Sequence, residues 1–315
     1  MNVPESSTFP DRDLGDVELS VVIVNYNGCD LLEECLRSVL EPGQTVRYET
    51  IVYDNASADH SRAMVRELFP TVRLLEGEAN IGLCRAFNKG VAASCGKYVL
   101  SLDSDTVILP GALDDMIGFL KENPEAGACG ATLIYPDGTR QRTARAFPNA
   151  LSAVFGRRSL MSRIWPDNPF SRRYMMADKE GSLTPYKVDS LSTACMMVRR
   201  SVIETVGAYD ERYFVYWSDT DWCQRIKKAG KAIYTLPAST VIHNENIKSG
   251  HRKVRRTRMV MDFHRGAYYY YATHHAGALN PMRYVAYVGL HLRAYVILFN
   301  DEDKRMNRIF GIGSV

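Results

Sequence analysis

The feature that most constrains the fold is a regular alternation of short apolar runs and amphipathic segments between residues 19 and 122. Turn-forming residues follow each run, and a segment with helical spacing comes next; the runs cover residues 19–24, 48–54, 72–76 and 97–105. Consecutive parallel strands need a crossover that returns the chain to the same end of the sheet. The sequence therefore predicts an α/β fold with helices on both faces of a mostly parallel sheet, which binds ligands at the carboxyl ends of its strands.

Polar residues follow each of the apolar runs. They are Asn25 and Tyr26 after the first, Asp54 at the end of the second, Asn80 after the third, and Asp103 and Asp105 at the end of the fourth. Any one of them could be a helix cap or a turn residue. Because the carboxyl ends of parallel strands meet at one edge, these residues together predict a ligand site there.

The two acids in LSLDSDT, residues 100–106, are spaced to share one cation. If the strand continues to its end, Asp103 and Asp105 lie on the same face. Two carboxylates can bind a hard cation such as Mg²⁺ or Mn²⁺, whose other ligands are often phosphate oxygens. Neither GxGxxG after the first run nor GxxxxGK[ST] occurs in the chain, so the usual dinucleotide and P-loop sites are not predicted. A bound metal ion is the remaining way to hold a phosphate group at this site.

The pattern is interrupted between residues 136 and 186, which we interpret as an insertion or mobile loop, or as an ordinary connection. Beyond it, Asp219 and Asp221 lie at or before the first turn of a predicted helix, where the helix dipole favours carboxylates. His243 ends the last predicted strand. It is either a metal or phosphate ligand or a partly buried polar residue.

Composition narrows the classes of function. The 315-residue chain is 46% hydrophobic and can bury a large core, and its net charge of +3 is too small to predict binding to nucleic acid. Basic residues nevertheless cluster at 157–173 and 248–265, where they could face an anionic substrate or membrane. The seven cysteines form no CxxC pair, which favours a reducing, cytoplasmic setting.

The two ends of the chain differ from its middle. Residues 1–17 are polar and acidic and show no signal-peptide pattern, so we expect a disordered lead-in. Residues 246–315 contain basic, aromatic and apolar runs and predict a helical extension. That extension packs on the domain or on a partner subunit, as in a homodimer, or lies on the membrane as a peripheral contact. No segment is long and apolar enough to span a bilayer.

Several ordered motifs together resemble the family 2 inverting glycosyltransferases with the GT-A fold, particularly their bacterial rhamnosyltransferase-like branch. The motifs are VVIVNYNG, VYDNASADHS, NIGLCRAFNKG, YVLSLDSD, ACMMVRRSVIETVGAYDERYFVYWSDTDWCQR, VIHN and HRGAYYYY. The match covers about residues 19–275. The resemblance implies a GT-A catalytic domain at 18–245, an acceptor-side insertion at 136–186 and a C-terminal helical extension at 246–315.

The resemblance also implies which residues bind the donor nucleotide. Asn25, Tyr26 and Asp54 match positions that line the nucleoside pocket, where the aspartate accepts a hydrogen bond from a pyrimidine ring. Asn80 and Arg85 match positions near the base, ribose and phosphates. The donor implied is a dTDP- or UDP-linked sugar.

The metal and the catalytic base follow from the same resemblance. Asp103, which also belongs to the donor site, and Asp105 match the DxD motif that holds Mg²⁺ or Mn²⁺, and His243 matches a position close to the metal and diphosphate. Asp219 matches the catalytic base. The family commonly has Glu-Asp where this chain has Ser218-Asp219, so Asp221 remains an alternative base.

A second departure from the family pattern is Thr193-Ala194, where Gly-Ala is common; it implies an altered acceptor pocket. The implied activity is metal-dependent transfer of a sugar, for which the branch suggests rhamnose, to a saccharide or polyprenyl-linked acceptor in cell-surface polysaccharide synthesis. A base for the acceptor hydroxyl and a cation for the leaving diphosphate suffice for such a reaction. A nucleotidyltransferase and a noncatalytic carbohydrate-binding protein with a degenerate transferase fold are the alternatives.

Overall fold

The computed structural model describes most of the chain. The described residues are 17–41, 46–148, 165, 168–179, 181–245, 252–277 and 279–309, without the side chains of 252–256 and 300–309. Of the predicted lead-in at 1–17, only residue 17 belongs to the described part. Three residues of the basic cluster at 157–173 also lie outside it, namely Arg157, Arg158 and Arg163.

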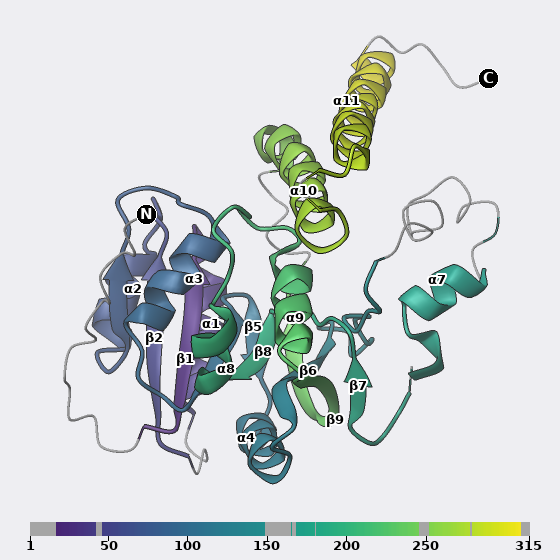
Figure 1. Ribbon diagram of the computed structural model, residues 1–315. Helices are drawn as coiled ribbons and strands as arrows, with labels where there is room; N and C mark the ends of the chain where they lie inside the picture. Colours follow the sequence, from purple (N-terminus) through teal and green to yellow (C-terminus); the bar gives the residue numbers. More distant parts are fainter. Residues whose placement is uncertain are drawn as a thin grey trace, which may run out of the picture.

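A nine-stranded sheet forms the centre of the described structure (Figure 1), in the order β3-β2-β1-β4-β8-β6-β9-β5, with β7 beside β9. The strands are β1 (Leu19–Asn25), β2 (Tyr48–Asp54), β3 (Arg73–Glu76), β4 (Tyr98–Asp103), β5 (Thr106–Ile108), β6 (Ala126–Ile134), β7 (Tyr186–Val188), β8 (Cys195–Arg199) and β9 (Ala232–His243). The four predicted runs are thus strands β1 to β4.

Helices connect and cover these strands. They are α1 (Cys29–Leu40), α2 (Ser61–Leu68), α3 (Leu83–Ala92), α4 (Ala112–Glu122), α7 (Pro169–Tyr174), η1 (Ala177–Lys179), α8 (Arg200–Val206), α9 (Ser218–Lys228), α10 (Arg252–His274) and α11 (Met282–Ile309). The insertion predicted at 136–186 therefore contains α7 and η1 in its described part.

The sheet is parallel in its first half and mixed in its second. β3, β2, β1 and β4 run parallel to one another. β8 then pairs antiparallel with both β4 and β6, while β6 pairs parallel with β9. β5 and β7 both pair antiparallel with β9. The predicted α/β class is confirmed, and the sheet is less uniformly parallel than the apolar runs alone suggest.

Burial of β1 explains why helices cover both faces of the sheet. Alternate residues of a strand point to opposite faces. Val21 and Ile23 join an apolar cluster with residues of α1, α2 and α4, whereas Val22 joins a second cluster with Phe87 of α3 and Trp222 of α9. Residues 19–23 are fully buried, so this strand has no solvent-facing side and its sequence is nearly all apolar.

The C-terminal helices attach to the domain through side chains of α10. The ring of Trp217, just before α9, packs against Phe263 and Tyr270 of α10. α11 packs mainly on α10 and extends away from the sheet (Figure 1). Within the described residues, no helix has the length and apolar character needed to cross a membrane.

The close approach of α3 to β1 gives a test of the packing. A Cβ on Gly90 would lie 2.4 Å from Cγ1 of Val22, and a β-branched side chain cannot easily turn away. We expect Gly90→Ala to lower the free energy of unfolding by about 1–3 kcal/mol, measured by urea denaturation, because overpacking strains a close-packed core.

Gly118 is the matched control, because it also lies inside a helix but a Cβ added to it would meet no atom within 4 Å. Gly118→Ala should raise stability by up to about 1 kcal/mol through helix propensity alone. Val22→Ala should lower the free energy of unfolding less in the Gly90→Ala background than in the wild type, because the smaller side chain makes room for the added methyl group. Equal stability of the two alanine variants would contradict this packing.

Candidate active site

Three strand ends meet at one edge of the sheet. Asn25 ends β1, Asp54 ends β2 and Asp103 ends β4. Asn25 is in register with Asp54, and Val24 is in register with Asp103. The parallel pairing therefore brings these predicted site residues to a common edge, as the sequence indicates.

Asp54 lies at the centre of a buried hydrogen-bond network and is 1% exposed. Its Oδ1 accepts hydrogen bonds from Arg62 Nε at 2.5 Å and from the Ser57 amide at 3.0 Å. Asn25 Nδ2 donates to Asp54 Oδ2 at 3.3 Å and to Ser57 Oγ at 3.2 Å. The bond to Asp54 raises the pKa of Arg62. The carboxylate is thus oriented by its own turn, by Asn25 and by Arg62.

Sequence reasoning did not find Arg62. It lies at the start of α2, eight residues after Asp54, and also donates to the Gly77 carbonyl at 2.6 Å. Asn25 is fully buried, and among the described residues its Oδ1 has no hydrogen-bond partner. An acceptor of this kind at a strand end suits a donor on a bound ligand, because a buried polar atom without a partner is costly.

The other predicted donor-site residues surround this network less directly. Asn80 Oδ1 accepts hydrogen bonds from Asn55 Nδ2 and the Gly82 amide, both at 3.1 Å, which shape the turn before α3. Tyr26 is 36% exposed at the end of β1. Arg85, in the first turn of α3, lies on the surface with its Nε 3.6 Å from an oxygen of Glu211.

Asp103, Asp105 and His243 form a group that could hold a metal ion, with one ligand atom from each within 4.8 Å of the others. His243 Nε2 lies 3.7 Å from Asp103 Oδ2 and 3.6 Å from Asp105 Oδ1. These distances exceed ordinary hydrogen bonds. Two ligands of a cation with metal–oxygen distances of about 2.1 Å lie roughly 3–4 Å apart, so the spacing and the donor set fit Mg²⁺ or Mn²⁺.

The two acids converge for a different reason from the one expected. β4 ends at Asp103, and Ser104 and Asp105 form a turn, so the pair does not share the face of a continuous strand. The turn leads into β5, whose Thr106 pairs with His243 of β9. The amide of Asn244 also donates to the Asp105 carbonyl at 2.8 Å. β5, which the sequence did not reveal, therefore places the histidine beside the acids.

Gln141 orients the imidazole of His243. Gln141 Nε2 donates to the His243 carbonyl, and Gln141 Oε1 lies next to Nδ1, both at 2.8 Å. The first bond fixes the orientation of the amide, so Nδ1 carries the proton and Nε2 presents a lone pair toward the acids. Burial lowers the pKa of His243, but the carboxylates of Asp105 and Asp103 outweigh this effect and raise it.

Asp219 and Asp221 both lie in the first turn of α9, yet they differ in surroundings. Two residues correspond to about 200° of helical rotation, so their side chains leave opposite sides of the helix. Asp221 is 1% exposed; its Oδ1 bonds His274 Nε2 at 2.7 Å, and its Oδ2 accepts from Arg225 Nε at 2.8 Å. Both oxygens of Asp221 are therefore already occupied within the protein.

Asp219 is partly exposed and bonds only to its neighbour in the described structure. Its Oδ1 accepts from the Thr220 amide at 2.7 Å and from the Thr220 hydroxyl at 3.3 Å. Burial raises the pKa of Asp219, although these bonds and the charge of Arg145 act in the opposite direction. Arg145 belongs to the predicted insertion and pairs with Ser190, so that segment contributes to the surroundings of Asp219.

Comparison with known proteins identifies the family. The model of "Glycosyl transferase family 2" matches residues 20–207. A Mycobacterium tuberculosis protein described as N-acetylglucosaminyl-diphospho-decaprenol L-rhamnosyltransferase is 30% identical over 302 residues, which cover 92% of this chain and 96% of that protein. The Myxococcus xanthus O-antigen biosynthesis protein RfbC is 25% identical over 244 residues, 76% of this chain and 18% of that protein.

Solved structures share the fold. Mannosyltransferase PcManGT from Pyrobaculum calidifontis, in complex with GDP-Man and Mn²⁺, has a TM-score of 0.55 at 18% identity and covers 95% of this chain and 76% of its own. GalNAc-T7 with UDP, GalNAc and Mn²⁺ has a TM-score of 0.54 at 16% identity, covering 74% and 44%. The chain belongs to glycosyl transferase family 2, as an enzyme with the GT-A fold that is similar to bacterial rhamnosyltransferases.

Proposed function

We propose that this enzyme transfers L-rhamnose from a dTDP- or UDP-linked donor to a saccharide or polyprenyl-linked acceptor by an inverting, metal-dependent reaction in cell-surface polysaccharide synthesis. The observation that carries the proposal is the group of Asp103, Asp105 and His243 at the strand ends, with the imidazole oriented by Gln141. The sugar and the acceptor follow from the mycobacterial relative, whose name gives both. Membership of the family favours sugar transfer over nucleotidyl transfer.

Each side chain has a role in this proposal. Asp54, oriented by Arg62, accepts a hydrogen bond from the nucleoside base, and Asn25 Oδ1 accepts a second one. Asn80 and Arg85 flank the donor, Tyr26 borders the base and Asp103 also lies against the donor phosphates. When bound, Mg²⁺ or Mn²⁺ neutralises the charge that develops on the leaving diphosphate. Asp103, Asp105 and His243 would hold it.

Asp219 takes the proton from the acceptor hydroxyl as this attacks the anomeric carbon. Its partial exposure and its raised pKa suit a base that meets the acceptor from solvent. Asp221 is the poorer candidate, because His274 and Arg225 engage its two oxygens. One carboxylate at the acceptor is enough, since inversion in a single displacement forms no covalent sugar intermediate.

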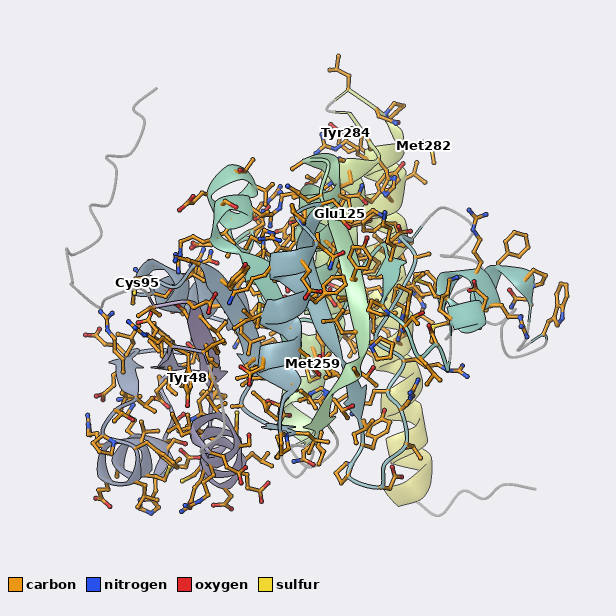
Figure 2. The ribbon with its side chains drawn as sticks, turned by 90° about the horizontal axis from the view of Figure 1, so that it is seen from below. Tyr48, Cys95, Glu125, Met259, Met282 and Tyr284 are labelled. Atoms are coloured by element: carbon orange, nitrogen blue, oxygen red, sulfur yellow. The ribbon has the colours of Figure 1, made fainter. Side chains whose placement is uncertain are left out.

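We assign the catalytic domain to residues 18–245, with 136–186 on the acceptor side, and the membrane contact to the extension at 246–315. An apolar arc on α11, about 120° wide at about 100° per residue, supports this contact. It consists of Tyr284, Val285, Val288, Leu292, Tyr295, Val296 and Phe299, each at least 51% exposed. Figure 2 shows Tyr284 at the rim of the molecule.

The charges beside this arc favour an anionic lipid surface over a second subunit. The two arginines of α11 with described side chains, Arg283 and Arg293, lie outside the arc, where they can reach phosphate headgroups. Tyrosines at the arc, which have an apolar ring and a polar hydroxyl, suit the boundary between lipid and water.

The metal role is tested by calorimetric titration of dTDP and UDP with and without Mn²⁺. We expect weak binding without the cation, and a larger loss of the cation-dependent part in Asp105→Ala than in Asp103→Ala. Gln141→Ala should weaken cation binding by about 10–100-fold, because the imidazole loses its orientation. Asp178→Ala, an exposed acid of 71% side-chain exposure, is the control. Equal nucleotide affinity with and without the cation would contradict the metal role.

The base assignment is tested by Asp219→Asn and Asp221→Asn. Asp219→Asn should lower kcat by about 10²-fold or more while leaving nucleotide and metal affinity unchanged. A base acts only when deprotonated, so in the wild type kcat/KM should fall as the pH drops through a pKa above the ordinary aspartate value of about 3.9. Near-normal turnover of Asp219→Asn together with an inactive, folded Asp221→Asn would exchange the two roles.

The membrane contact is tested by flotation with vesicles of phosphatidylglycerol and phosphatidylcholine. The wild type should float with anionic vesicles, and Leu292→Glu with Val296→Glu should prevent it, because burying a carboxylate in the apolar boundary is costly. Leu183→Glu is the control, since Leu183 is 85% exposed and lies far along the chain from α11. A dimer that the α11 substitutions dissociate, without any vesicle binding, would assign the arc to a subunit interface instead.

A further inference from the structure

The contact between Asp221 and His274 joins the helix that carries Asp219 to the C-terminal extension. The two residues are 53 positions apart, and their side chains are 1% and 2% exposed. Tyr213, which is itself buried, contributes its hydroxyl 3.4 Å from the same oxygen of Asp221. A buried carboxylate needs such partners, because removing one leaves an uncompensated charge. The position of α9 is thus tied to α10.

The hydrogen bonds determine the tautomer of His274. The ammonium group of Lys228 has only N–H donors, and it lies 3.0 Å from Nδ1 of His274. Nδ1 must therefore accept this bond, and the ring proton is on Nε2, which donates to Asp221. The imidazole is held at both nitrogens by side chains of α9. Tyr270 adds a third contact, donating from its hydroxyl to Gln224 at 3.0 Å.

α10 also packs against Trp217, the residue that precedes α9. Trp217 has a φ of 73°, which is uncommon for a bulky side chain and persists only where its surroundings impose it. The rings of Phe263 and Tyr270 lie 5.6 and 5.5 Å from its ring. A Cβ on Gly266 would lie 2.7 Å from the Tyr216 carbonyl oxygen, so the helix backbone approaches this segment closely.

We propose that His274 is a positioning residue for sugar transfer. By donating to Asp221 on one side of α9, it fixes the rotation and depth of that helix, and so the place of Asp219 on the opposite side. A base displaced by a fraction of its hydrogen-bonding distance loses most of its effect on the acceptor hydroxyl. The inference rests on the proposed role of Asp219, and it adds a residue outside the matched family segment at 20–207.

The test compares His274→Ala, His274→Gln and His275→Ala. His275 is the neighbouring residue on the chain and is exposed, so its substitution controls for the loss of an imidazole. One assay measures transfer of the sugar from dTDP-L-rhamnose to N-acetylglucosaminyl diphosphopolyprenol. A second measures hydrolysis of dTDP-L-rhamnose in the absence of this acceptor, through the dTDP that is released. Calorimetry measures the affinity for dTDP with Mn²⁺, and thermal unfolding confirms that each variant is folded at the assay temperature.

We expect His274→Ala to lower kcat at least 10-fold, with the affinity for dTDP and Mn²⁺ within twofold of the wild type. His274→Gln retains an N–H donor and should restore kcat to within about threefold of the wild type, because the bond to Asp221 can form again. His275→Ala should behave as the wild type. A lower kcat with unchanged nucleotide and metal affinity distinguishes a positioning role from a general loss of structure.

Unchanged kcat in folded His274→Ala would overturn the proposal. If that variant does not fold, His274→Phe, which fills the space without a donor, takes its place. Misfolding of both, with full recovery in His274→Gln, would show a role in folding alone and also overturn it. Asp219→Asn in the same assays separates the proposed base from the proposed positioning residue. If Asp219→Asn stays active, the assignment of the base is wrong. If Asp219→Asn is inactive and His274→Ala is active, only the role of His274 is wrong.

Discussion

The pairing of β5 with β9 is the contact on which the candidate site depends. β5 is only three residues long, yet it follows the turn that contains Asp105 and sets Thr106 opposite His243. Ser38 of α1 secures this strand by accepting a hydrogen bond from the Ile108 amide at 3.0 Å. The imidazole reaches the carboxylates because two strand ends that lie far apart in the sequence are held in register. Geometry of this kind comes from the sheet and not from a local motif.

The sequence predicted what depends on local patterns. Strands buried on both faces need continuous apolar runs, so β1, β2 and β4 were visible directly, and the polar residues that end them marked the edge of the sheet. The first turn of α9 was visible because its apolar positions recur at helical spacing. The family resemblance then supplied what periodicity cannot, namely an order among these motifs and a chemistry for them.

The remaining features depend on contacts between distant segments. Gln141 lies in an irregular connection, 102 positions from the His243 that it orients, and no local pattern distinguishes it from a surface glutamine. His274 is similarly one of two adjacent histidines in an aromatic run, of which only the structure shows which faces α9. Asp103 and Asp105 were correctly expected to converge, but a turn brings them together and not the continued strand on which the expectation was based.

The opposite placement of the two acids on α9 has a consequence for how the chain should be divided. Composition separates a part that ends near residue 245 from a basic, aromatic tail, and a shortened protein would naturally be cut there. Such a cut would expose the carboxylate of Asp221, remove the rings that cover Trp217, and release the very helix that bears Asp219. A protein that keeps these contacts of α9 therefore extends at least through His274. Composition thus places the domain boundary near residue 245, whereas the contacts that hold α9 place it after His274.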